Sequence, residues 1–98
     1  MERRTSHRVQ VDLAVEERTD GARYFQRAAD LSESGVWLAS TLPHPPGTPV
    51  ELELALPGAP MRVRGEVAGS DRHLGMAVRF VALGDDQRER IGDYLRVR

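Results

Sequence analysis

Apolar and polar residues alternate with a period of two along most of the chain, which is the pattern of half-buried β-strands. The first run keeps valine and leucine on one face from Val9 to Val15, and similar runs recur as far as Phe80. Glycine, proline and aspartate at turn positions separate the runs. We therefore predict six strands, over residues 9–16, 23–29, 35–39, 50–56, 61–67 and 76–80.

Most connections between these strands are short. The exception is a loop over residues 42–49, whose four prolines lack amide donors and fix the backbone. The turn at residues 57–60 joins the fourth and fifth strands into a hairpin. Because parallel strands need crossover connections of about a dozen residues or more, the sheet is expected to be antiparallel. The predicted architecture is an antiparallel barrel over residues 9–81.

The period changes near the C-terminus. After Asp85, the apolar side chains of Ile91, Tyr94 and Leu95 recur at helical spacing, and acidic residues occupy the first turn, where the helix dipole favours them. This pattern predicts an amphipathic helix over residues 85–96 that packs against the barrel or covers one end of it. The predicted fold class is all-β with one C-terminal helix.

Length and charge limit the kinds of protein that this chain can be. Its 98 residues, 40% of them hydrophobic, are enough for one modest core, so we expect a single domain over residues 1–98. All 14 cationic residues are arginines, and 15 acidic residues leave a net charge of -1. A protein that binds nucleic acid as a polyanion normally carries a basic surplus. We therefore expect no nucleic-acid partner and a local role for the arginines.

The composition also favours a cytoplasmic protein. There is no cysteine for disulfides or thiolate metal sites, and no apolar run is long enough to insert into a membrane. The first residues lack the apolar core of a signal peptide. We expect the chain to be complete from Met1. The three histidines are scattered and show no metal-ligand spacing. No catalytic motif is present, so we expect neither enzymatic activity nor a bound metal or cofactor.

Two polar clusters carry the candidate chemistry. Arg4 and Arg8 form an R-x-x-x-R motif near the N-terminus, and Asp30, Ser32 and Gly35 form a D-x-S-x-x-G motif. A guanidinium group can grip phosphate oxygens or the O6/N7 edge of guanine, while a carboxylate can accept hydrogen bonds from guanine N–H groups. The two motifs together indicate a guanine nucleotide as the ligand.

In this order, ahead of a strand-rich body, the motifs resemble those of the PilZ family of cyclic di-GMP receptors. The stretch 74–80, followed by an acidic helix start, is similar to the final strand of that family. The resemblance covers almost the whole chain. It implies a six-stranded antiparallel PilZ-type β-barrel with a C-terminal helix, in agreement with the pattern of the sequence, and cyclic di-GMP as the ligand.

The resemblance also implies a role for each motif residue. Arg4 and Arg8 would contact the phosphates and guanines of cyclic di-GMP, and Asp30 and Ser32 would hydrogen-bond a guanine. Gly35 would let the chain turn sharply into the next strand and let a base approach the backbone. Each assignment has a simpler alternative. The arginines can belong to a frayed terminus, and the aspartate and serine can be turn formers that bond to the backbone, which we expect in addition to binding.

Two further residues are possible parts of the site. Arg3 is either an additional phosphate contact or a solvated charge. Trp37 falls on the strand face opposite Val36 and Leu38, so it is either exposed, where it could stack on a base or dock a partner, or buried, as tryptophan more often is.

Three functional hypotheses follow. The leading one is a receptor in which cyclic di-GMP orders a flexible ligand-binding segment, residues 1–8, and thereby signals to an unidentified downstream protein. This receptor would be a monomer or weak dimer. The alternative is a PilZ module that acts by protein contacts without a ligand. The third, a barrel that binds single-stranded nucleic acid, is disfavoured by the net charge of -1.

Overall fold

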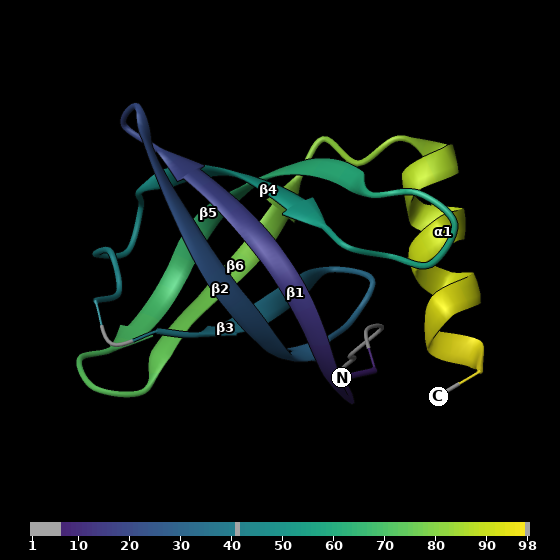
Figure 1. Cartoon of the computed structure of the whole chain (residues 1–98), viewed down its shortest axis with the longest axis horizontal. Coiled ribbons are helices and arrows are strands. Elements are labelled where there is room, and N and C mark those ends of the chain that lie inside the picture. Colours follow the sequence, from purple (N-terminus) through teal and green to yellow (C-terminus); the bar gives the residue numbers. More distant parts are fainter. Residues whose placement is uncertain (1–6, 41, 98) are drawn as a thin grey trace, which may run out of the picture.

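The protein is described by a computed structural model, which covers residues 7–40 and 42–97. Six antiparallel strands close into a barrel in the order β1-β2-β3-β6-β5-β4, and one helix lies at an end of the barrel (Figure 1). The predicted fold class is confirmed. The elements are β1 (Val9–Thr19), β2 (Ala22–Leu31), β3 (Gly35–Ala39), β4 (Pro49–Leu54), β5 (Met61–Asp71), β6 (Gly75–Val81) and α1 (Asp85–Arg96).

The core consists of the inward-facing half of each alternating strand. Leu31, Leu38 and Leu54 are fully buried, as expected where successive side chains point to opposite faces of a sheet. The helix completes this core, since Ile91 is fully buried and Tyr94 is 8% exposed. The helix thus packs against the barrel. It is the only helix in the described part of the chain, and it is too short and too polar to span a membrane.

Strands β1, β2 and β5 each extend three or four residues beyond the ranges that the sequence pattern predicts. Strands β1 and β2 extend to a two-residue turn at Asp20 and Gly21, whose positive φ angles of 51° and 79° suit the twist of a tight hairpin. Strand β5 continues past Val67 through a bulge and reaches Asp71. The connection to β6 is therefore shorter than the gap between the predicted strands 61–67 and 76–80, because backbone pairing with β6 continues where the apolar alternation stops.

A buried polar cluster stands at the barrel end away from α1. The carboxylate of Glu17, which is fully buried, accepts hydrogen bonds from Thr19 Oγ1 at 2.5 Å and from Gln26 Nε2 at 2.9 Å. His44 Nε2 lies 2.6 Å from the same carboxylate, and the ring of Tyr24 meets the His44 ring edge-on at 5.2 Å. This cluster ties the proline-rich loop to β1 and β2.

Candidate functional site

The structure brings the two motifs together at one point. Arg8 directly precedes β1, and the antiparallel register pairs Val9 with Leu31, which places Arg8 beside the end of β2. Arg8 Nη1 donates a hydrogen bond to Asp30 Oδ1 at 2.9 Å. Arg3 and Arg4 lie outside the described residues.

The Arg8–Asp30 pair is open to solvent. The side chains are 59% and 28% exposed, so the pair is worth no more than about 1 kcal/mol. A guanidinium group has five N–H donors, of which the pair uses one. The remaining donors of Arg8 and the second oxygen of Asp30 can therefore contact a ligand, while the pair itself orients both groups.

Asp30 does not act as a turn former, contrary to our expectation. It lies within β2, opposite Gln10 on β1 and Trp37 on β3, because β2 runs two residues further than predicted. Its carboxylate projects from a strand and bonds to Arg8.

Ser32 is the turn former of the second motif. Its side-chain oxygen accepts hydrogen bonds from the amides of Ser34 and Gly35, both at 3.2 Å, and its own amide donates to the Gly35 carbonyl at 2.9 Å. The residue is 3% exposed. Its hydroxyl therefore holds the connection between β2 and β3, while its contact with a guanine stays a prediction.

Gly35 is needed for close packing. It begins β3 directly after the three-residue turn from β2, pairs with Arg79 on β6, and has no positive φ, so the turn does not require left-handed backbone at this glycine. A Cβ atom at this position would lie 2.4 Å from the Val78 carbonyl oxygen, well below any normal contact distance. Only glycine allows β6 to approach the motif this closely.

We predict that Gly35→Ala destabilises the domain by about 1–3 kcal/mol, because the clash is with backbone that must shift. Gly69→Ala is the matched control, since a Cβ there meets nothing within 4 Å. It should change stability by less than about 1 kcal/mol. Urea unfolding followed by the fluorescence of the single tryptophan measures both. Equal stability of the two variants would contradict the packing role.

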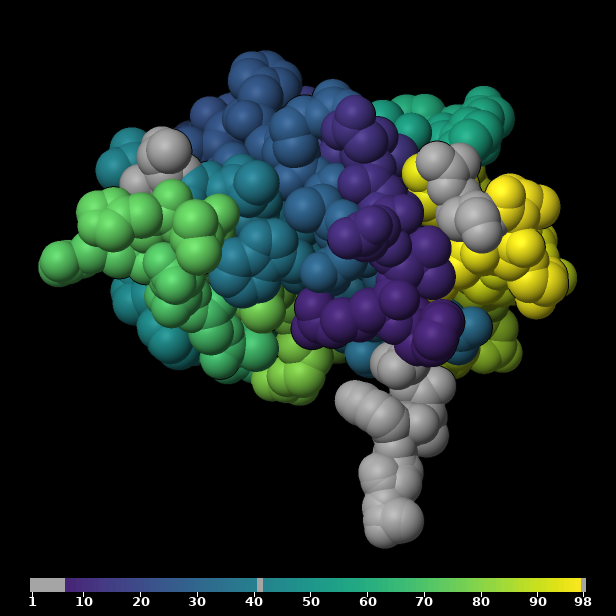
Figure 2. Space-filling view, turned by 90° about the horizontal axis from the view of Figure 1, so that it is seen from below, coloured from purple at the N-terminus to yellow at the C-terminus, as the bar shows by residue number. Residues whose placement is uncertain are grey.

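Trp37 lies on the outer face of the barrel and is partly buried there. Its cross-strand neighbours are Asp30 on β2 and Ala77 on β6. The indole is therefore next to the Arg8–Asp30 pair, on the same surface. Figure 2 shows this face: the start of β1 is purple, and residues of the strands that follow β1, drawn in blue, lie beside it.

Arg79 was missed by the sequence interpretation. It pairs with Gly35 and is exposed on the outer face, where its Nη2 donates to Glu66 Oε1 at 2.8 Å. Its position two residues beyond Ala77 makes it a diagonal neighbour of Trp37. The only signal in the sequence was an arginine at an outward position of the last strand. The surface thus combines two arginine–carboxylate pairs and an indole.

Solved structures with the same fold come from several bacteria. The inhibitor of motility of Bacillus subtilis (MotI/DgrA) has a TM-score of 0.84 and 15% identity, and the match covers 99% of this chain and 51% of that chain. The PilZ domain of YcgR from Escherichia coli with c-di-GMP has a TM-score of 0.79 and 12% identity, with coverage of 98% and 91%.

A third structure, PlzA of Borreliella burgdorferi in complex with c-di-GMP, has a TM-score of 0.75 and 15% identity, and the match covers 95% of this chain and 41% of that chain. The chain thus spans about half the length of MotI and less of PlzA. No curated protein matches it by sequence. The family model of the PilZ domain matches residues 2–96, nearly the whole length, and the chain therefore belongs to the PilZ family.

Proposed function

We propose that this domain binds cyclic di-GMP on the surface that contains Arg8 and Asp30, and that binding signals to a partner protein by ordering residues 1–8. The main support is the hydrogen bond between Arg8 and Asp30, two motif residues that are 22 positions apart in the sequence. Arg4, and Arg3 as a second cation, are assigned to the site from the motif alone. Two structures with this fold contain c-di-GMP, those of YcgR and PlzA.

Each group has a distinct task in this proposal. The free N–H donors of Arg8 contact a phosphate, with Arg4 on the same ligand. The second oxygen of Asp30 accepts from guanine N–H groups. Ser32 holds the turn that follows Asp30. Gly35 allows β6 to lie close to β3, which brings the exposed side chain of Arg79 to the same surface. Trp37 offers an apolar surface next to the guanine.

The turn of the second motif provides a route for the signal. Glu33 lies beside α1, since its Oε2 is 3.3 Å from the place that a Cβ of Gly92 would occupy. A ligand bound next to this turn would therefore lie near both Arg8 and the helix. It shifts the domain only as far as its affinity differs between the two arrangements.

Calorimetric titration with cyclic di-GMP, cyclic di-AMP and GMP tests the proposal. We expect cyclic di-GMP to bind at least about tenfold more tightly than cyclic di-AMP, because adenine lacks the N1–H and 2-amino donors from which Asp30 accepts. GMP, with one base and one phosphate, should bind more weakly. If cyclic di-GMP produces no heat while a protein partner still binds, the ligand-independent module is the correct function.

Hydrogen exchange on the same samples tests the signalling step. Amides in residues 1–8 should exchange more slowly when cyclic di-GMP is added, because ligand contacts order the segment. Unchanged exchange in this segment, with binding intact, would refute ordering as the signal.

A further inference from the structure

The surface around the two motifs carries a second arginine–carboxylate pair, which has no task in the proposed function. Arg79 Nη2 donates a hydrogen bond to Glu66 Oε1 at 2.8 Å, close to the 2.9 Å between Arg8 and Asp30. The side chains of the two arginines are equally exposed, at 58% and 59%. Each pair takes one of the five N–H donors of its guanidinium group. The second pair thus offers a ligand the same groups as the first.

The strand register places this second pair in line with the motif residues. Gly35 on β3 is paired with Arg79 on β6, which is paired in turn with Glu66 on β5. On the other side, the amide of Ser32 donates to the Gly35 carbonyl across the turn, and Arg8 lies beside the end of β2. One row across the barrel therefore runs from Arg8 to Glu66 through the second motif.

The neighbouring row offers a surface on which a base can rest. Asp30 is paired with Trp37, and Trp37 with Ala77. Ala77 is paired in turn with Gly69, where a Cβ atom would meet nothing within 4 Å, so there is open space over β5 at this point. Trp37 thus lies beside Asp30 and is a diagonal neighbour of Arg79 on its other side. The indole separates the two arginine–carboxylate pairs.

Cyclic di-GMP carries two identical guanines, and a single carboxylate such as that of Asp30 accepts from one of them. The Cα atoms of Asp30 and Arg79 are two strands and one row apart, about 12 Å at the usual strand spacing and rise. Two bases joined by a ring of sugars and phosphates can bridge this distance. On guanine, the acceptors N7 and O6 lie next to the N1–H and 2-amino donors, so a guanidinium group beside a carboxylate matches both.

Another exposed pair, Arg27 with Asp12, also lies near the indole. Arg27 is paired with Ala39, two residues beyond Trp37, so it too is a diagonal neighbour of the indole. However, this pair lies on the side of Trp37 away from the motif turn. The residues of both motifs that the structure describes lie in the row of Trp37 or on the turn side of it. A ligand held by them therefore extends toward Arg79.

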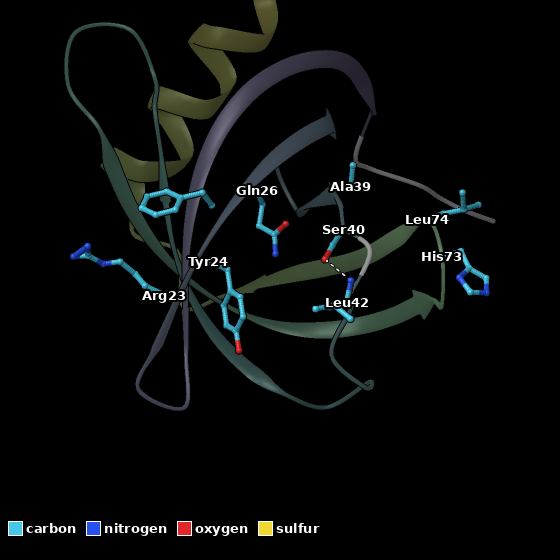
Figure 3. Close-up of a pocket in the computed structure, with 9 residues that line it drawn as sticks. Arg23, Tyr24, Gln26, Ala39, Ser40, Leu42, His73 and Leu74 are labelled. Atoms are coloured by element: carbon cyan, nitrogen blue, oxygen red, sulfur yellow. Dashed lines mark hydrogen bonds between the residues drawn. The ribbon is translucent and has the colours of Figure 1, made fainter.

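A hollow on the side of the indole away from the turn is also less suited to a guanine. It measures about 730 Å³ and reaches Ala39, and Tyr24, Gln26 and His73 are among the residues that line it (Figure 3). None of the described residues around it has a carboxylate that could accept from guanine N–H groups. The pair on β5 and β6 is thus the better place for the second guanine.

We propose that Arg79 and Glu66 bind the second guanine of cyclic di-GMP. Arg79 donates to O6 and N7, and Glu66 accepts from N1–H and the 2-amino group. This inference rests on the proposed function, because it requires Asp30 to hold the first guanine and Arg8 a phosphate. It adds two specificity-determining residues that lie outside both motifs. With them, the protein selects guanine at both ends of the ligand.

The hybrid dinucleotide 3′,3′-cyclic GMP-AMP, which has one guanine and one adenine, tests the inference in calorimetric titrations beside cyclic di-GMP. We expect the wild type to bind cyclic di-GMP at least about tenfold more tightly than the hybrid, because adenine lacks the N1–H and 2-amino donors. Glu66→Gln with Arg79→Gln should weaken cyclic di-GMP at least about fivefold. The hybrid should lose less than about twofold, since its guanine lies at Asp30. The preference then falls to about twofold, the statistical advantage of a ligand with two equivalent guanines.

The double variant keeps the net charge, and it should fold, because exposed pairs contribute little to stability. Arg27→Gln with Asp12→Asn is the matched control. It removes another exposed arginine–carboxylate pair beside the indole and should leave the wild-type preference intact. The inference is overturned if the control removes the preference, or if Glu66→Gln with Arg79→Gln weakens both nucleotides equally, which would indicate a phosphate contact alone.

Arg8→Ala in the same titrations separates this inference from the proposed function. If Arg8→Ala weakens cyclic di-GMP while Glu66→Gln with Arg79→Gln keeps the wild-type preference, only the role of the second pair is refuted. If the wild type binds no cyclic di-GMP, the proposed function and the inference both fail.

Discussion

Arg8→Ala is expected to weaken cyclic di-GMP binding by at least about 100-fold in calorimetric titration. Hydrogen bonds between a charged donor and a phosphate contribute about 1.5–3 kcal/mol each, and the alanine variant loses at least two donors to the ligand together with the contact that places Asp30. The fold should survive, because the Arg8–Asp30 pair is exposed. Arg62→Ala, which removes another exposed arginine paired with a carboxylate, is the control and should bind normally.

A charge exchange separates ligand binding from the ion pair. Arg8→Asp combined with Asp30→Arg can restore the pair, but it presents a carboxylate to the phosphate and a guanidinium to the guanine N–H groups. We expect this double variant to fold and to bind no cyclic di-GMP. Wild-type affinity in Arg8→Ala, or in the exchanged variant, would show that the ligand does not use this surface.

Glu17→Ala is expected to lower the free energy of unfolding by about 3–5 kcal/mol, a large share of the stability of a small domain. The substitution leaves Thr19, Gln26 and His44 without their acceptor at a buried position. Urea unfolding followed by tryptophan fluorescence measures the loss. Glu17→Gln keeps the shape and one acceptor oxygen, so it should cost about 1–2 kcal/mol.

The same substitution should loosen the proline-rich loop. His44 attaches that loop to the barrel through Glu17, so limited proteolysis within residues 42–48 should be faster in Glu17→Ala than in Glu17→Gln. If the free energy of unfolding of Glu17→Ala lies within about 1 kcal/mol of the wild-type value, the cluster does not stabilise the fold as its geometry indicates.

The candidate site was predicted in part. The pairing of Arg8 with Asp30 follows the expected convergence of the two motifs. The packing role of Gly35 was not foreseen, because the clash is with a carbonyl of β6 that is more than forty residues away in sequence. Arg79 was missed for the same reason, since nothing local marks it as a neighbour of Gly35.

The buried polar cluster shows that the alternation of the first strand continues beyond its predicted end at residue 16. Glu17 and Thr19 continue the inward face of Leu13 and Val15, but a charged residue at such a position looks like the end of a strand. Its three hydrogen-bond partners lie on β1, on β2 and in the loop, and only the folded barrel brings them within reach. Burial of the carboxylate is tolerable because those partners replace water.

The amino-acid sequence alone determined the strands, the helix and the antiparallel arrangement, because alternation, helical spacing and short connections act over a few residues. It also marked the two motifs. Tertiary structure decided which groups lie next to each other: Arg8 with Asp30, Gly35 with the β6 backbone, and Glu17 with His44. These contacts depend on register and barrel closure, which arise from the packing of the whole core and from no local pattern.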